Sequence, residues 1–293
     1  MTEKERLVKG YLAATATLFM WAGFSLVSRL GGKSVLTPYD IFALRLITAS
    51  LILLPFAGSM PKRVWADKRL WLLTCLCSLI YCPLAYSGFK YAPASHGAIL
   101  ISGLQPFLVS MIVWLFLGTR PSRIRSIGLI LIASGIVCAA LPYLFEWFPD
   151  YAFGDILMFL SSICWACYTI LATRWGYPPW TLTRAIAFGS AIVYLPIYWL
   201  WFPSEIPNAP LSAVVIQGAF QGISATILAM LTYLKALELL GAERATSFLA
   251  LVPIVIGVLA VPMLDEPLTL WLGAGIAFVS LGSYIASKAG RSR

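Results

Sequence analysis

Long apolar runs separated by short polar joins recur along the whole chain. Ten of these runs hold about 20 residues or more, the length that a helix needs to cross a hydrocarbon core of about 30 Å. The pattern therefore predicts an all-α polytopic membrane protein with ten transmembrane helices. The predicted helices cover residues 10–30, 38–58, 69–89, 95–117, 124–142, 153–175, 181–202, 211–236, 244–264 and 268–287.

The composition agrees with this prediction. Of the 293 residues, 60% are hydrophobic and 11% are charged, which gives more apolar surface than a soluble domain of this length can bury. We therefore expect the lipid bilayer to be a partner of the chain. All six cysteines fall within apolar runs, and the Cys164-x-x-Cys167 spacing has neither a second pair nor a nearby histidine. We predict packing residues there, and neither a metal site nor a cofactor.

Basic residues indicate the orientation of the helices. The net charge of +9 is spread over the joins rather than collected in one stripe, so nucleic acid is not an expected partner. Lysine and arginine concentrate at every second join, whereas the remaining joins hold only Arg29, Lys33 and Lys90. Retained positive charge marks the cytoplasmic side of a membrane protein. We therefore expect both termini in the cytoplasm and the protein in the inner (plasma) membrane of a bacterium.

Two segments with an internal proline resemble each other. SGLQPFLVSMIVWLFLGTRP covers residues 102–121, and ALVPIVIGVLAVPMLDEP covers residues 250–267. In the same way, MWAGFSLVSR early in the chain resembles CWACYTILATR in its second half. The similarity extends to glycines that recur 147 positions later, namely Gly128 with Gly275 and Gly135 with Gly282. We therefore predict two five-helix repeats, residues 1–146 and 147–293.

A repeat of five helices must enter the membrane upside down the second time, because five is odd. The turn after the fourth helix of the first repeat, Thr119-Arg120-Pro121, then faces the cytoplasm. Its counterpart Asp265-Glu266-Pro267 faces the outside, where positive charge is not retained. Inverted repeats are the architecture of transporters that alternate access to a site near the membrane midplane.

The order of the ten helices, the second-helix sequence PYDIFALRLITAS and the two proline turns resemble the EamA-type branch of the drug/metabolite transporter superfamily. The resemblance covers essentially the whole chain, and within the branch it is closest to the exporters of aromatic amino acids. It implies a secondary transporter that exports small metabolites. One departure is that the acid which the family carries at these turns is absent from Gly118-Thr119-Arg120 in the first repeat.

We predict that a monomer exports small amphipathic metabolites, above all aromatic and other neutral amino acids. The alternative is a carrier of the same fold for drugs, purines or sugar phosphates. A dianionic sugar phosphate needs several basic groups, and Arg45 is the one strongly charged residue well inside a predicted helix. An enzyme needs a nucleophile–base pair or metal ligands at one depth, which a single histidine without deep acids does not provide.

Matching positions of the two repeats should line a midplane site. Trp21 and Trp165 lie halfway along the first and sixth helices, and Ser25 and Thr169 follow one turn later. These tryptophans either wall a central cavity or fill gaps between helices. Two polar stripes spaced i, i+4, i+7 either bind the ammonium and carboxylate of a substrate or join helices to each other. The stripes are Thr74, Ser78 and Tyr81 in the third helix and Gln217, Gln221 and Ser224 in the eighth.

The remaining candidates concern charge and movement. Arg45 is either an anchor that pairs with Asp40 or snorkels outward, or a contact for a substrate carboxylate. His96, the one histidine, is either a proton-coupling group or an interfacial polar residue. The prolines inside predicted helices are expected to act as hinges, with Gln105 beside the second of them serving the kink or the cavity. These prolines are Pro83, Pro106 and Pro253.

Overall fold

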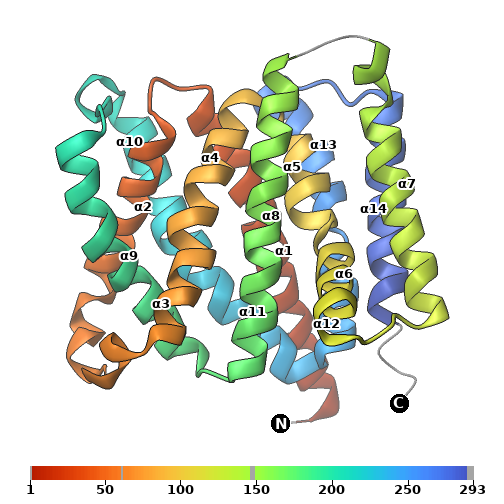
Figure 1. Ribbon diagram of the computed structural model, residues 1–293, viewed down its shortest axis with the longest axis horizontal. Coiled ribbons are helices and arrows are strands. Elements are labelled where there is room, and N and C mark those ends of the chain that lie inside the picture. Colours follow the sequence, from red (N-terminus) through yellow and green to blue (C-terminus); the bar gives the residue numbers. More distant parts are fainter. Residues whose placement is uncertain (1, 61, 146–148, 289–293) are drawn as a thin grey trace.

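The computed structural model describes residues 2–60, 62–145 and 149–288 as a bundle of helices that run between two ends, without strands in those ranges (Figure 1). Helix α1 begins and α14 ends at the lower end of the bundle as drawn in Figure 1. The turn that follows α6 also lies at this lower end, whereas the turn between α13 and α14 lies at the upper end (Figure 1).

The helices of the first half precede residue 146 and those of the second half follow it. The first half contains α1 (Glu3–Gly32), α2 (Pro38–Leu53), η1 (Leu54–Ser59), η2 (Lys62–Ala66), α3 (Lys68–Thr74), η3 (Cys75–Ile80), α4 (Tyr81–Tyr91), α5 (Ala94–Gly97), η4 (Ala98–Gly103), α6 (Gln105–Leu117) and α7 (Arg123–Phe145). The second half contains α8 (Pro149–Trp175), α9 (Pro179–Trp201), η5 (Ile206–Asn208), α10 (Leu211–Gln217), η6 (Gly218–Leu228), α11 (Ala229–Leu240), α12 (Ala242–Leu249), α13 (Val252–Leu264) and α14 (Leu270–Lys288).

Local sequence signals explain where several helices begin. Thr2 and Thr37 each accept a hydrogen bond from the backbone three residues on, and the acidic side chain there, Glu5 or Asp40, bonds back to the threonine N–H. These reciprocal bonds satisfy backbone donors that a helix start otherwise leaves open. Pro38 then occupies the first turn of α2, where its missing N–H does no harm.

Nine helical segments of the described residues are long and apolar enough to cross a membrane, each matching one of the predicted runs. The exception is the predicted run 244–264. Here the structure has two shorter helices, α12 and α13, separated by Ala250 and Leu251. The polytopic helical class is thus found, while the count of ten depends on treating α12 and α13 as one passage.

The predicted fourth and ninth helices break at equivalent places. Leu104 interrupts the fourth immediately before Gln105 and Pro106, and Ala250 and Leu251 interrupt the ninth before Val252 and Pro253. Both prolines therefore stand in the first turn of a new helix rather than inside a continuous kinked one. The sequence pattern predicted prolines inside continuous helices. The structure has them at helix starts, where a proline is tolerated because no intrahelical N–H bond is needed.

Three segments are π-helical, in which backbone bonds run from i to i+5. They are Cys75–Ile80, Ala98–Gly103 and Gly218–Leu228. The i, i+4, i+7 spacing of the two predicted polar stripes assumed α-helices, so the assumption of one straight face was wrong for both. The stripes are nonetheless turned inward: all of their members are buried except Ser224, which is half-buried.

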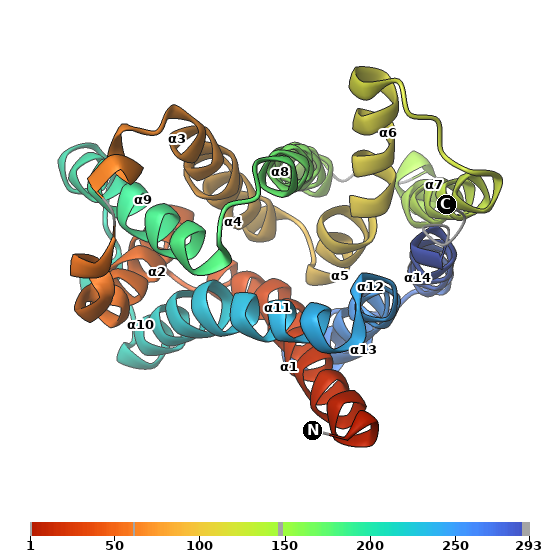
Figure 2. The ribbon, with the colours of Figure 1, turned by 90° about the horizontal axis from the view of Figure 1, so that it is seen from below.

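Glycines bring α7 and α14 into backbone contact at one edge of the molecule (Figure 2). A Cβ on Gly128 would lie 2.6 Å from the carbonyl oxygen of Gly282, and one on Gly135 would lie 2.7 Å from that of Gly275. The earlier glycine of each helix thus meets the later glycine of the other, so the helices cross antiparallel. Small residues permit this approach between membrane helices.

The two halves also interleave in the middle of the bundle. Helix α1 packs against α11 and α13, and α8 packs against α4 and α6 (Figure 2). Each of these contacts joins one half to the other, and the second pair repeats the first with the halves exchanged. The core is therefore shared, and neither half encloses its own.

Substitution of Gly275 by alanine should destabilise the protein by about 1–3 kcal/mol, the usual penalty of overpacking. The added methyl would meet the Gly135 carbonyl oxygen at 2.8 Å, and backbone yields little. Gly273→Ala in the same helix is the control, because its nearest neighbour there is Leu268 at 3.9 Å. Thermal unfolding in detergent should show a lower midpoint for Gly275→Ala alone, and equal midpoints would contradict the close crossing.

Candidate functional site

A chain of hydrogen bonds crosses the centre of the bundle and involves both halves. Arg45, in the middle of α2, donates from Nη1 to the hydroxyl of Tyr86 at 3.1 Å. Tyr86 donates in turn to Oε1 of Gln221 at 3.2 Å, and Nε2 of Gln221 donates to Ser28 Oγ at 3.0 Å. Tyr86 and Gln221 are fully buried, whereas Arg45 is half-buried. The predicted pairing of Arg45 with Asp40 is wrong.

Asp40 is instead occupied at the start of α2. Its carboxylate accepts hydrogen bonds from Thr37, from the hydroxyl of Tyr198 and from the backbone N–H of Glu205. Among the described residues, no carboxylate lies within ion-pair distance of Arg45. The guanidinium therefore keeps donors that are not committed to a protein anion.

Aromatic rings surround the same guanidinium. The Cζ atom of Arg45 lies 6.0 Å from the ring centroid of Phe24, which stacks on Tyr81 at 6.2 Å. Tyr81 is in turn 5.1 Å from Trp165, and Trp165 is 5.3 Å from Tyr168. We call Phe24, Arg45, Tyr81, Tyr86 and Trp165 the central cluster. It brings together three residues predicted from the sequence with two, Phe24 and Tyr86, that were missed.

The two predicted tryptophans each contact the other half. Trp21 lies 5.1 Å from Tyr233 of α11, while Trp165 of α8 contacts Tyr81 of α4. Both indoles are half-buried. Both contacts join the first passage of one half to the third passage of the other, at positions that do not correspond, and only Trp165 joins the central cluster. Whether either ring walls a cavity or fills a gap stays a prediction.

Some polar atoms of the predicted residues have hydrogen-bond partners, and others do not. Nε2 of Gln217 donates to the Val27 carbonyl at 2.7 Å, and Nε2 of Gln105 donates to the carbonyls of Ile101 and Ser162. These bonds join helices, as one interpretation expected. However, Oε1 of both glutamines has no partner, nor does Oγ of the fully buried Ser25. Buried acceptors of this kind are uncommon in folded proteins.

The other predicted hydroxyl side chains either donate to a carbonyl of their own helix or lie in the π-helical segments. Thr169 donates to the Trp165 carbonyl and Thr74 to that of Leu70, each within its own helix. Ser78 is buried in η3, and Ser224 lies half-buried in η6. Pro83 stands in α4, directly after the π-helical segment η3.

His96 lies at the upper end, where α5 meets the start of α8. Its Nδ1 is 2.8 Å from Oδ1 and 3.1 Å from Oδ2 of Asp155, and its ring packs on Tyr151. The imidazole is buried. This pairing could not be predicted from the sequence, because Asp155 is 59 positions away. Both roles considered for His96 stay open.

A buried ion pair at the upper end was also missed. Nε of Arg29 lies 2.8 Å from Oε1 of Glu266, joining the end of α1 to the turn after α13. Charge counting had treated the two residues separately, as members of outer joins. The pair could have been suspected, because Arg29 and Glu266 lie at or just after the ends of predicted helices, on the side of the bundle that was expected to face outward.

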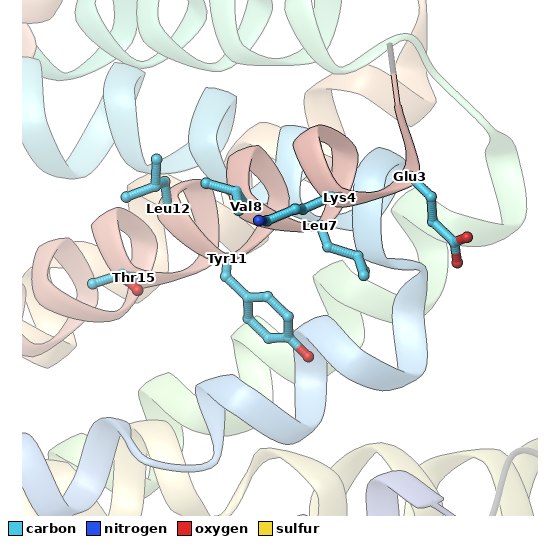
Figure 3. A pocket seen from close by; sticks show the side chains of 7 residues that line it. All are labelled: Glu3, Lys4, Leu7, Val8, Tyr11, Leu12 and Thr15. Atoms are coloured by element: carbon cyan, nitrogen blue, oxygen red, sulfur yellow. The ribbon is translucent and has the colours of Figure 1, made fainter.

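An open hollow lies far from the central cluster. Its volume is about 590 Å³, and Figure 3 shows that the residues lining it belong to the start of α1, at the lower end. They are Glu3, Lys4, Leu7, Val8, Tyr11, Leu12 and Thr15. Because a single helix lines this hollow, it is not the predicted site between the two halves. Within the described residues, no group of three metal-ligating side chains is found.

Comparison with known proteins agrees with the membrane architecture. The EamA-like transporter family matches residues 8–141 and again residues 152–288. An uncharacterized transporter of Archaeoglobus fulgidus is 28% identical over 288 residues, covering 96% of this chain and 99% of its own. Uncharacterized transporter YwfM of Bacillus subtilis is 26% identical, with 94% and 92% covered. Inner membrane protein YtfF of Escherichia coli is 25% identical, with 84% and 85% covered.

A crystal structure of a protein with 16% identity superimposes with a TM-score of 0.67 over the whole of both chains, which shows a shared fold. Apolar helices, the match of the family and relatives named as transporters define an integral membrane protein that transports rather than catalyses. The chain belongs to the EamA-like transporter family. The resemblance noted from the sequence is thus confirmed at the level of the family.

Tyr86→Phe should weaken the centre of the molecule by about 1–3 kcal/mol, because Gln221 Oε1 loses its donor and Arg45 its acceptor inside the bundle. Tyr81→Phe is the control, since Tyr81 enters the central cluster through its ring. Thermal unfolding in detergent compares the two variants. Similar midpoints would show that the bond chain does not stabilise the core.

Proposed function

We propose that this protein is a secondary transporter that exports small amphipathic metabolites by alternating access around the central cluster. Aromatic and other neutral amino acids are the favoured substrates. The working unit is a monomer in the inner membrane of a bacterium. Its ten membrane passages form two inverted five-helix repeats, residues 1–146 and 147–293, with both termini in the cytoplasm.

Four observations support the inverted repeats. The family matches the chain twice, and the helices that carry corresponding glycines cross antiparallel, the earlier glycine of each meeting the later glycine of the other. Breaks precede both Pro106 and Pro253, and the turns that follow those helices lie at opposite ends of the bundle (Figure 1). A unit repeated in the same direction would put both turns at one end. Charge retained at alternate joins supports cytoplasmic termini.

The half-buried cation of Arg45 is the observation that carries the substrate proposal. A carboxylate can accept charge-assisted hydrogen bonds from a guanidinium whose donors are not taken by a protein anion. Phe24, Tyr81 and Trp165 offer ring faces and edges to an aromatic or apolar body. The unused Oε1 atoms of Gln105 and Gln217, with the Ser25 hydroxyl, are acceptors for an ammonium once the helices move.

The remaining predicted residues fit the same scheme. Trp21, Thr169, Ser78, Gln221 and Ser224 belong to four of the proposed passages and are proposed to line the site. The helix breaks at Pro106 and Pro253, with Pro83 beyond η3, are the proposed hinges. His96 and Asp155 form the titratable pair that we propose for proton coupling. A facilitated carrier that leaves this pair unused is the alternative.

A second candidate is a carrier of the same fold for drugs, purines or sugar phosphates. The aromatic cluster is compatible with planar drugs or purines. A phosphate dianion fits less well, because Arg45 is the one cationic member of the cluster. Amino acids therefore rank first.

Purified protein in liposomes should take up labelled tryptophan or phenylalanine in preference to a sugar phosphate. Arg45→Gln should weaken apparent affinity roughly 10- to 150-fold, the equivalent of one charged hydrogen bond of about 1.5–3 kcal/mol. Arg45→Lys should retain part of it, and Trp165→Ala should reduce flux without loss of insertion. Leu51→Ala, on the exposed face of α2, is the control. Uptake of sugar phosphate alone would overturn the amino acid assignment.

A further inference from the structure

A buried ion pair connects the two halves at the upper end. Arg29 and Glu266 are only 9% and 6% exposed, and they approach to 2.8 Å. Arg29 belongs to the last turn of α1, and Glu266 to the turn between α13 and α14. Separating such a pair without giving either charge to water is costly, so it resists any motion that pulls the two elements apart.

The pair is the centre of a wider network that closes this end. Nη1 of Arg29 also donates to the carbonyls of Phe89 at 2.8 Å and Lys90 at 2.9 Å, at the end of α4. The second oxygen of Glu266 accepts the backbone N–H of Ala94 at 2.8 Å, where α5 begins. Lys33 donates to the Leu264 carbonyl at the end of α13. Two elements of the first half, the end of α1 and the start of α5, are thereby bonded to one turn of the second, and Arg29 also bonds to the end of α4.

The turn that carries Glu266 has an unusual backbone. Asp265 adopts φ 55° and ψ 35°, the left-handed region, which aspartate enters more readily than most residues. Its equivalent in the first half, Gly118, has the same left-handed conformation at φ 67°. The two turns therefore share a shape, and they differ in the side chain that follows.

The equivalent place at the lower end holds no such pair. By the repeat, Arg174 corresponds to Arg29, and Thr119, followed by Arg120, corresponds to Glu266. All three side chains are exposed. Elsewhere at this end, Tyr177 donates to Asp67 at 2.6 Å and so lowers the pKa of that carboxyl group. That bond involves one charge and half-exposed groups, and Arg184 also joins the halves at this end by donating to the Phe56 carbonyl at 2.9 Å.

We propose that the Arg29–Glu266 network is a latch which holds the upper end closed, so that the empty transporter rests with its central cluster accessible from the lower, cytoplasmic end. This inference rests on the alternating access and orientation proposed above. Opening the upper end requires the latch to break. Substrate must offset the free-energy difference between the two states by binding more tightly to the state that is open at the upper end. For an exporter, this bias presents the empty site to the compartment from which substrate is taken.

Glu266→Gln removes the charge and keeps an oxygen for Ala94. Cys77, Cys82 and Cys164 lie around the central cluster. In right-side-out membranes, a membrane-impermeant thiol reagent added outside should label them at least tenfold more in the variant than in the wild type. A tenfold rise corresponds to a loss of about 1.4 kcal/mol from the closed state. Mass spectrometry locates the labelled cysteines. Arg174→Gln, the equivalent position at the lower end, should leave outside labelling unchanged. Wild-type labelling in Glu266→Gln would overturn the latch.

A cross-link tests the same latch without relying on a destabilised variant. Arg29→Cys with Glu266→Cys, joined by a flexible bis-methanethiosulfonate that forms a disulfide with each thiol and releases two methanesulfinates, should lose at least nine-tenths of its flux and regain it on reduction. Flux that persists in the linked protein would contradict the proposal. The labelling experiment needs no substrate. A correct latch without amino acid flux would therefore refute the proposed function alone, and amino acid flux without altered labelling would refute the latch alone.

Discussion

Hydrocarbon offers no water to a polar group, so a polar side chain inside the bundle is costly without a partner in the protein. Hydroxyls such as those of Thr74 and Thr169 donate within their own helix, whereas longer polar side chains reach another helix. Gln217 bonds to the backbone of α1, Gln221 bonds to Ser28 and Tyr86, and Arg45 bonds to Tyr86. The bonds that make these groups tolerable in a membrane are thus the same bonds that join the two halves around the central cluster.

The same constraint explains where the backbone is irregular. A helix break leaves carbonyl and amide groups open, which is acceptable only inside the protein or beside water. The breaks at Leu104 and at Ala250 and Leu251 lie at equivalent places of the two halves. At the first of them, Gln105 donates to the Ile101 carbonyl and to Ser162 of α8, so a side chain replaces part of the lost backbone bonding. Irregular backbone therefore marks the same region as the unused buried acceptors.

The sequence was sufficient for the helical class, the positions of the passages and the family, because apolar length and proline turns are local signals. It was also sufficient to show that Tyr81, Gln217 and Gln221 face inward. It did not predict partners. Asp40, a neighbour along the chain, was one of the partners considered for Arg45, whereas Tyr86 approaches from another helix.

Periodicity cannot supply such pairings, since it reports which face is buried and not what that face meets. The π-helical segments were missed for a related reason: a spacing count presumes 3.6 residues per turn. The buried state of Ser78 and Gln221 survived that error because both stripes are surrounded by other helices. The missed residues Phe24 and Tyr86 are apolar or aromatic positions that no polar pattern distinguishes from ordinary core.

Two inverted copies of identical sequence would have two states of equal energy, one open at each end. Any preference between them must come from residues at which the copies differ. The proposed topology would keep arginines from the upper turn, but an exposed neutral residue would satisfy that requirement equally well. It does not explain an acid that is 6% exposed and bonded through both oxygens. The placement of Glu266 is therefore a property of the closed end itself, added to the charge rule that orients the chain.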